Sequence, residues 1–285
     1  FSGTLNVNLG TGIVTGDGND KLIDFEVIKF GTGDNIITGS TNADTIFGNS
    51  GADTLIGTAG GDTFFGSGGT DRFIGDTATG NDTFIGGADA DTADYSADSD
   101  DLTVDFSGTD SVTGTGIGTD KLGGVEVVKT GSGDDEFTGS TGDETFYGGG
   151  GADTFYGSGG ADILSGEGGV DIFMMADTAG NDTIIGGAAI DTADYSTDAD
   201  DLTVDLSGTG SVTGTGIGTD KISGVEFINL GTGDDTFISG STDDTIDGSA
   251  GGQDVADYTG FSGTLNVNLG TGIVTGDGND KLIDF

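Results

Sequence analysis

The sequence predicts an all-β fold in which short strands and tight turns alternate at a fixed interval. Three observations support this: a nine-residue repeat, larger repeats built from it, and a composition dominated by glycine and acidic residues. Glycine accounts for 61 of the 285 residues, and each glycine inside a helix costs about 1 kcal/mol relative to alanine. Because so regular a period decides the architecture, it is interpreted before any single element.

The nine-residue repeat combines a turn and a strand. From Gly39 the chain reads GSTNADTIF, GNSGADTLI, GTAGGDTFF and GSGGTDRFI, and a second series starts at Gly139. The half rich in glycine, serine and aspartate is typical of a turn, whereas DTLI or DTFF is typical of a strand. The large apolar residue of each strand is expected in the core, which gives Ile37, Ile46, Leu55, Phe64, Phe73, Phe146, Phe155, Leu164 and Phe173.

Longer repeats divide the chain. Residues 1–25 recur unchanged as residues 261–285, a period of 260 residues. The chain starts at Phe1 and not at Met, so we expect it to be part of a longer protein. Identity at all 25 positions predicts that this parent is a long array of near-identical copies. Related segments starting at Gly86, Gly186 and Gly251 mark smaller units within the period. These units are 1–95 (linking strands 1–30, nonapeptides 31–95), 96–195, a short unit 196–258, and 259–285, the start of the next copy.

The charge balance calls for a bound cation. Asp and Glu number 50 against 7 Lys and Arg, for a formal net charge of −43. A chain this acidic is expected to be disordered, but its 17 Phe and regularly spaced apolar residues favour a fold. Cations must therefore neutralise the carboxylates. The same charge disfavours nucleic acid and anionic lipid as partners, and no apolar run has the length of a membrane span.

The composition also argues against an enzyme. Without His or Cys, the chain lacks the commonest general base and any thiolate metal ligand or disulfide. Paired carboxylates could serve glycoside hydrolysis. Here, however, acids recur throughout and no unique pair stands out, so we expect no catalytic activity.

The pattern G-x-x-G-x-D-x-U-x, in which U is a large apolar residue, resembles the hemolysin-type (RTX) nonapeptide of large bacterial surface and secreted proteins. GGGGADTFY at Gly148 matches the family's G-G-x-G-x-D-x-U-x at every defined position. The resemblance implies a right-handed parallel β-roll, a β-solenoid in which two nonapeptides form one coil and U points into a thin core. It also implies that Ca²⁺ lies between turns that are 18 residues apart.

The chemistry of position six agrees with this resemblance, because Ca²⁺ prefers hard oxygen ligands. Stacking is expected to bring Asp53 near Asp71 and Asp44 near Asp62. Two like charges about 4 Å apart repel by about 4 kcal/mol at an effective dielectric constant of about 20. A divalent ion reverses that sign, so metal binding and folding are expected to be one event. The predicted ligands are Asp44, Asp53, Asp62, Asp71, Asp82, Asp91, Asp135, Asp153, Asp162, Asp171, Asp182, Asp191, Asp235, Asp244 and Asp254.

Four further aspartates lie in the turns that precede each series. Asp20, Asp120, Asp220 and Asp280 are predicted to bind calcium in the same way, although other positions depart from the pattern. Asn35 and Glu144 replace aspartate and are predicted to be weaker ligands. The second glycine is often replaced, which is expected to weaken some turns, as at Ser40, Asn49, Thr58 and Ser67.

The segments between the nonapeptide series alternate apolar and polar residues, as in Leu202, Val204 and Leu206, and are predicted to continue the same sheets as strands. Tyr95, Tyr195 and Tyr258 are expected to close the coil where each series ends. Two sets of acidic residues could bind an extra cation: Asp98, Asp100 and Asp101, and Asp198, Asp200 and Asp201. A solvated acidic turn is favoured, because the EF-hand spacing is absent.

The favoured function is a calcium-stabilised structural repeat of an extracellular filament, sheath, surface layer or adhesin stalk of a secreted, bacterial protein. Further copies of the chain are the expected partners, with cell-surface polysaccharide as another candidate. One alternative is an RTX secretion or folding module of a secreted toxin or hydrolase. A minor alternative is an ice-binding or other adhesive face formed by Thr45, Thr54 and Thr63, although Arg72 interrupts this row.

Overall fold

The computed structural model describes residues 3–16, 19–22, 25, 27–75, 80–175, 180–249, 252–276 and 278–285, with only the backbone at 19–21. It contains two compact units, Phe1–Glu136 with Thr145–Gly149 and Phe137–Glu144 with Gly150–Phe285. Every regular element among the described residues is a β-strand. No helix in this part of the chain is long and apolar enough to cross a membrane.

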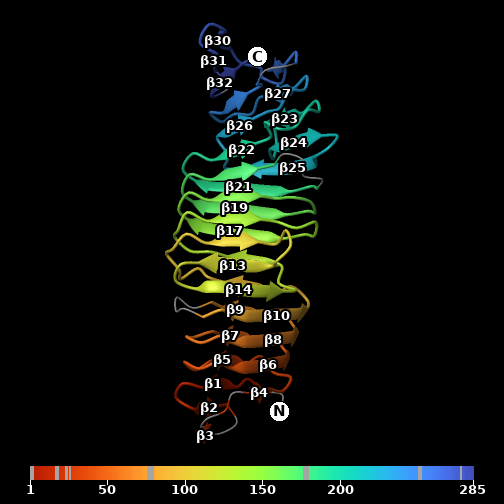
Figure 1. Ribbon diagram of the computed structural model, residues 1–285. Coiled ribbons are helices and arrows are strands. Elements are labelled where there is room, and N and C mark those ends of the chain that lie inside the picture. The colour runs from red at the N-terminus through yellow and green to blue at the C-terminus, as the bar shows by residue number, and fades with distance from the viewer. Residues whose placement is uncertain are drawn as a thin grey trace. The chain divides into compact units, whose positions relative to one another are not determined.

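The first unit has two sheets of short strands that stack one above another (Figure 1). In spatial order, the first sheet contains β3 (Asn19–Lys21), β2 (Ile13–Thr15), β1 (Asn6–Asn8), β5 (Ile36–Thr38), β7 (Thr54–Ile56), β9 (Arg72–Ile74), β11 (Thr92–Asp94), β15 (Val127–Lys129) and β17 (Thr145–Gly150). The second contains β4 (Val27–Lys29), β6 (Thr45–Ser50), β8 (Thr63–Gly68), β10 (Thr83–Ala88), β14 (Gly118–Gly123), β13 (Ser111–Gly114) and β12 (Thr103–Asp105).

The second unit is built in the same way. Its first sheet contains β19 (Ile163–Gly168), β21 (Thr183–Ala188), β25 (Gly218–Ser223), β24 (Ser211–Gly214), β23 (Thr203–Asp205), β27 (Thr236–Ile238) and β29 (Val255–Asp257). Its second contains β16 (Glu136–Thr138), β18 (Thr154–Tyr156), β20 (Ile172–Met174), β22 (Thr192–Asp194), β26 (Phe227–Asn229), β28 (Thr245–Asp247), β32 (Asn279–Ile283), β31 (Ile273–Thr275) and β30 (Asn266–Asn268).

Successive nonapeptides supply strands to the two sheets in turn. Each strand therefore pairs in parallel with the strand two repeats away: Leu55 stands beside Ile37 on one side and Phe73 on the other. Where two extra residues precede a repeat, Phe84 still lies beside Phe64. The predicted coil of two nonapeptides is confirmed, and the chain folds as an all-β parallel β-roll.

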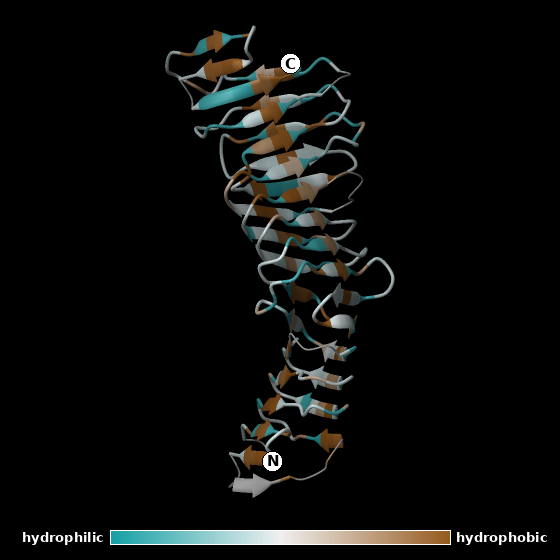
Figure 2. Cartoon of the chain, turned by 60° about the vertical axis from the view of Figure 1, so that its left-hand side comes forward, coloured by the Kyte–Doolittle hydropathy of each residue, from teal (hydrophilic) through white to brown (hydrophobic). Residues whose placement is uncertain are grey.

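The core is the row of large apolar residues at position eight. All nine predicted core residues are fully buried, at 0% exposure. Figure 2 shows hydrophobic (brown) and hydrophilic (teal) residues on the stacked strands. Within the core, the rings of Phe155 and Phe173 stack with their centroids 4.9 Å apart. Because adjacent side chains of a strand point to opposite faces, one large residue per short strand is enough to fill so thin a core.

The linking segments form strands within the same sheets, as predicted, but they run as antiparallel meanders. In the first unit, β12 pairs antiparallel with β13, and β13 pairs antiparallel with β14, which returns the chain to lie parallel with β10. The second unit repeats this with β23, β24 and β25. The parallel roll therefore contains a local antiparallel insertion at each linking segment.

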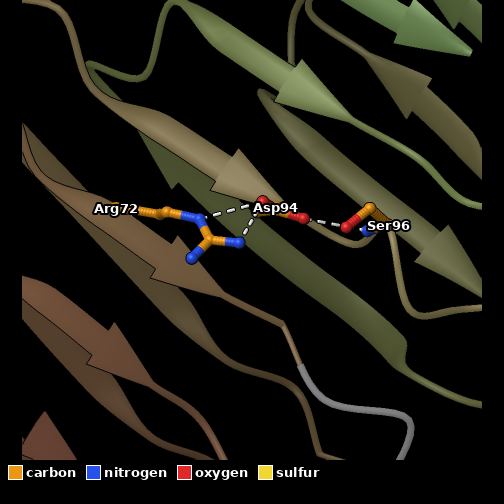
Figure 3. Close-up of polar contacts among 3 residues, drawn as sticks. All are labelled: Arg72, Asp94 and Ser96. Carbon is orange, nitrogen blue, oxygen red and sulfur yellow. Dashed lines mark hydrogen bonds and ion pairs between the residues drawn. The ribbon is translucent and has the colours of Figure 1, made fainter. Parts of the chain in front are cut away.

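One of the few basic residues compensates an acid directly. Arg72 donates hydrogen bonds to Asp94 Oδ2 from Nε, at 2.9 Å, and from Nη2, at 2.6 Å, and the Ser96 N–H donates to Asp94 Oδ1 at 3.0 Å (Figure 3). Burial alone would raise the pKa of Asp94, but the hydrogen bonds from Ser96 and Arg72 lower it. The Arg72 side chain is 50% exposed, so this ion pair contributes at most about 1 kcal/mol.

Candidate metal sites

The acids at position six form a hydrogen-bonded ladder along each edge of the roll. The backbone N–H of Asp53 donates to Asp71 Oδ1 at 2.8 Å, and that of Asp44 donates to Asp62 Oδ1 at 2.8 Å. Both predicted neighbours are therefore confirmed. Each acid lies directly before a strand, so the parallel pairing of the strands fixes the spacing of the ladder.

The same arrangement holds the other predicted acids. Across inserted residues, Asp62, Asp71 and Asp82 donate their N–H groups to the Oδ1 atoms of Asp82, Asp91 and Asp120. In the second unit, the residues whose Oδ1 accepts a backbone N–H in this way are Asp162, Asp171, Asp182, Asp191, Asp220, Asp235, Asp254 and Asp280, and Asp153 donates its own N–H to Asp171. Asp135 accepts from the N–H of Leu102.

The second carboxylate oxygen of many of these acids is buried without a hydrogen-bond partner. Such an atom keeps its desolvation cost, about 1–3 kcal/mol or more for a charged group, and native proteins hold few of them. Among the residues that the structure describes, it is Oδ2 of Asp53, Asp62, Asp71, Asp91, Asp162, Asp171, Asp182, Asp191 and Asp235. Unpaired buried oxygens that recur along both ladders indicate that a ligand is needed between the turns.

The first glycine of the nonapeptide leaves room beside these oxygens. A Cβ on Gly66 would lie 2.1 Å from Asp71 Oδ2 and 2.9 Å from the carbonyl oxygen of Gly86. A Cβ on Gly39 would lie 3.3 Å from Oδ2 of both Asp44 and Asp62. Carboxylate oxygens of stacked turns and a backbone carbonyl oxygen thus converge on spaces that any side chain would fill.

The electrostatics of the ladder also favour binding of a cation. Burial, followed by the charges of Asp82 and Asp44, raises the pKa of Asp62 to about 7, although the Asp44 N–H acts in the opposite direction. Burial likewise raises the pKa of Asp71 and Asp162 to about 7, and that of Asp91 and Asp171 to about 6. Desolvation and like charges favour the neutral acid, and a divalent ion would reverse this preference.

These donors fit Ca²⁺. The converging atoms are carboxylate and backbone carbonyl oxygens, which are hard ligands. No three acidic side chains among the described residues meet closely enough to hold a metal ion by themselves. Each ion would therefore be held by one or two carboxylates together with backbone oxygens, and when bound it would supply the positive charge that the ladder lacks.

The acids that open each series differ from the rest. Asp120 Oδ2 accepts a hydrogen bond from the Tyr95 hydroxyl at 2.9 Å. The pairs Tyr195–Asp220 and Tyr258–Asp280 repeat this contact at the same distance. Burial, followed by the charge of Asp220, raises the pKa of Tyr195 well above its usual range, so its hydroxyl stays protonated. Each tyrosine thus lies at the end of its nonapeptide series, as predicted, and its hydroxyl donates a hydrogen bond to the aspartate that opens the following series. The side chain of Asp20 lies outside the described residues.

The two replacements at position six are compensated locally. Asn35 is 1% exposed and donates a hydrogen bond from Nδ2 to Asp53 Oδ1 at 2.8 Å. This bond stabilises the negative charge of the Asp53 carboxylate. Glu144 accepts hydrogen bonds from the N–H and the hydroxyl of Ser140. Asp244 accepts from the Thr242 hydroxyl at 3.0 Å on both oxygens. Protein donors thus occupy ligand atoms at Glu144 and Asp244.

Two further ladder positions lie outside the nine-residue pattern. Glu126 Oε2 accepts the N–H of Asp91 at 3.0 Å, and Glu226 Oε2 accepts that of Asp191 at 3.0 Å. Both glutamates directly precede a strand, as the aspartates do, although the nine-residue spelling is lost there. An acid immediately before a short apolar strand was the signal that could have found them.

The acidic residues of the linking segments are also less exposed than expected. Asp98 and Asp198 are each only 6% exposed, and Asp98 Oδ2 is buried without a hydrogen-bond partner. Asp100 and Asp101 are exposed. The expectation of a solvated turn therefore fails for Asp98 and Asp198, because the following turn stacks on it: the Ser132 N–H donates to the Asp98 carbonyl at 3.1 Å.

Comparison with known families agrees with this geometry. The model of the RTX calcium-binding nonapeptide repeat (4 copies) matches residues 31–64, 47–77, 122–155, 138–173, 175–202 and 216–252, together more than half of the chain. Comparison with curated proteins gave no match. The matched ranges include buried acids of both ladders, such as Asp53 and Asp62, and the chain belongs to the family of RTX calcium-binding nonapeptide repeats.

Proposed function

We propose that this chain is a calcium-stabilised structural repeat of a long extracellular filament, sheath, surface layer or adhesin stalk. The observation that carries the proposal is the exact recurrence of residues 1–25 as residues 261–285. Near-identical copies suit a role that needs length and uniform mechanics, because no single copy has to hold a unique site.

The two copies of this segment also fold alike. In the first, β1 pairs antiparallel with β2 with Val7 opposite Val14. In the second, β30 pairs antiparallel with β31 with Val267 opposite Val274. The recurring segment is thus a defined structural element, the meander that separates nonapeptide series. This supports a chain in which the pattern continues from one copy to the next.

A location outside the cell is supported by the metal sites. The net charge of −43 must be offset before the ladder can pack, and millimolar calcium is the range in which extracellular calcium modules bind. RTX repeats are typical of secreted bacterial proteins. We assign the chain no catalytic role, and its proposed partners are further copies of itself, with cell-surface polysaccharide as a further candidate.

The competing function is a secretion or folding module of a secreted toxin or hydrolase, which would share the calcium chemistry. Sequencing the gene on both sides of this segment, together with denaturing electrophoresis of the native protein, separates the two. We expect further copies with the 260-residue period and a parent chain several times longer than 285 residues. A single copy joined to a catalytic domain would contradict the structural role.

A further inference from the structure

We infer that each of the two acidic linking turns, residues 96–101 and 196–201, holds a calcium site of its own, in which Asp98 or Asp198 is a ligand. The inference goes beyond the proposed function, because it assigns metal ions to two places where no nonapeptide supplies the acid. It holds whether or not the chain is part of a filament.

Each linking turn stacks on the first nonapeptide turn of the series that follows, but a leucine stands in the place of its position-six acid. The Leu102 N–H donates to Asp135 Oδ1 at 2.7 Å. In the same way, the Leu202 N–H donates to Asp235 Oδ1 at 2.8 Å. Within the nonapeptide series, this N–H belongs to the residue at position six. Because leucine has no side-chain oxygen, a cation at this level of the roll needs an acid from elsewhere in the linking turn.

Asp98 provides a buried acid in the first linking turn. It lies four residues before Leu102 and is 6% exposed. Its Oδ1 accepts the N–H of Asp100 at 2.8 Å, whereas its Oδ2 is buried and has no hydrogen-bond partner among the described residues. The turn therefore uses only one of the two oxygens. Because an unpaired buried charged atom keeps its desolvation cost, Oδ2 indicates a ligand outside the turn.

The stacked turns bring the acids of the two levels close together. The Ser132 N–H donates to the Asp98 carbonyl at 3.1 Å, and a Cβ on Gly131 would lie 1.9 Å from that carbonyl oxygen. Burial raises the pKa of Asp135 to about 6, and the charges of Asp101 and Asp98 act in the same direction. The carboxylates of the two turns thus repel one another, and a divalent ion between them would offset that repulsion.

The second linking turn has the same construction. Asp198 is 6% exposed, and its Oδ1 accepts the N–H of Asp200 at 2.8 Å. A Cβ on Gly216, in the hairpin of β24 and β25, would lie 3.9 Å from Asp198 Oδ2 and 3.4 Å from Asp200 Oδ2, so both oxygens face one space. The Oδ2 of Asp235 is also buried without a hydrogen-bond partner among the described residues. Two carboxylates, with backbone oxygens and water, are a ligand set that suits Ca²⁺.

The linking segment at residues 1–25 supports the pairing, because it lacks both acids. The Leu5 N–H donates to Asn35 Oδ1 at 3.2 Å, which is the same stacking contact. The residue four positions before Leu5 is Phe1, where the other two turns have aspartate. The stacked residue Asn35 is an amide that donates from Nδ2 to Asp53 Oδ1. The two acids are thus present together in two turns and absent together in the third, as expected if they share an ion.

The test is the number of calcium ions bound per chain at saturation, measured by equilibrium dialysis of the full chain. Asp98→Asn and Asp198→Asn keep the Oδ1 atom that accepts the N–H of the turn, and they remove the charge that a bound ion requires. Each single variant is expected to bind one ion fewer than the unaltered chain, and D98N/D198N two fewer. If D98N/D198N binds as many ions as the unaltered chain, the inference is overturned.

The matched control is D105N/D205N, which removes the same two charges from the linking segments. Oδ1 of Asp105 also accepts an N–H from two residues further on, that of Ser107 at 2.8 Å, and Asp205 repeats this contact. Both acids are only partly buried. The control is expected to bind as many ions as the unaltered chain. An equal loss of ions from the control and from D98N/D198N would assign the loss to net charge and would overturn the inference.

A crystal structure of the unaltered chain in calcium keeps the inference testable if D98N does not fold. Anomalous scattering is expected to place an ion about 2.3–2.6 Å from Asp98 Oδ2 and another at the same distance from Asp198 Oδ2. The absence of an ion at either oxygen would overturn the inference. Both readouts use the 285-residue chain alone, so their failure is distinct from finding a catalytic neighbour in the gene, which would contradict the proposed function.

Discussion

The shared calcium site between stacked turns predicts a specific non-additivity between Asp53 and Asp71. Substitution by asparagine keeps the Oδ1 atom that accepts a backbone N–H from the stacked turn. Asp53 Oδ1 accepts the N–H of Asn35 at 2.7 Å, and Asp71 Oδ1 accepts the N–H of Asp53 at 2.8 Å. The substitution removes the negative charge that a bound ion requires. Asp53→Asn and Asp71→Asn therefore report mainly on the ion.

The magnitude follows from binding linkage. At a calcium concentration 100 times the dissociation constant, one site adds about 2.7 kcal/mol to the free energy of unfolding. If both acids serve one ion, each single variant loses about that amount, and the double variant loses little more. The coupling energy is then about 2–3 kcal/mol, within the range seen for residues of one network.

The assay is urea unfolding followed by circular dichroism in saturating calcium, for the two single variants and the double variant. The matched control pairs Asp53 with Asp62, which lies in the next nonapeptide and belongs to the other ladder through Asp44 and Asp82. That pair is expected to be additive within about 0.5 kcal/mol. Additivity of Asp53 and Asp71 would refute the shared site.

Three further substitutions test the roles of single residues, the first two by urea unfolding in calcium and the third by calcium titration. Tyr195→Phe is expected to lose about 1–3 kcal/mol, because a buried carboxylate oxygen loses its donor; no loss would contradict the tyrosine closure. Ser67→Gly is expected to gain about 1 kcal/mol, because Ser67 has a φ of 84°. Ser40→Gly, where φ is not positive, should bring no gain. Gly66→Ala is expected to lower calcium affinity, because its Cβ would lie 2.1 Å from a ligand oxygen. Gly68→Ala, whose Cβ would meet nothing closer than 3.8 Å, should retain it, and equal affinities would contradict the cradle.

The nonapeptide period was enough to predict the strands, the core and the stacking of the acids. A period that places one large apolar residue and one acid at constant positions leaves a single arrangement in which both repeat in register. Phe64 and Asp62 illustrate this: both have their predicted stacked neighbours. Where the spelling breaks, as at Glu126, the prediction failed, although the structure keeps an acid in the same place.

The sequence could not predict the antiparallel course of the linking meanders, because alternation of apolar and polar residues is the same in parallel and antiparallel strands. It also could not predict the partners of isolated polar groups. The Nζ atoms of Lys29 and Lys129 lie over the rings of Phe47 and Tyr147, at 4.7 and 4.8 Å from the ring centroids. Such contacts depend on which strands become neighbours.

At the positions where another residue replaces the second glycine, the local backbone conformation decides whether the replacement is unfavourable. Asn49 and Ser67 adopt positive φ values of 75° and 84°, a region that favours glycine, so the expected weakening of these turns has a physical basis. Ser40 and Thr58 do not adopt positive φ. Only the conformation distinguishes the two pairs, since all four occupy the same position of the repeat.

The central claim, that calcium binding and folding are one event, is tested most directly by circular dichroism of the same sample in millimolar calcium and after chelation with EGTA. The unpaired carboxylate oxygens of the ladder and the net charge of −43 predict that the β signal is lost on chelation and restored when calcium is added back. A β signal that is unchanged in EGTA would contradict the account.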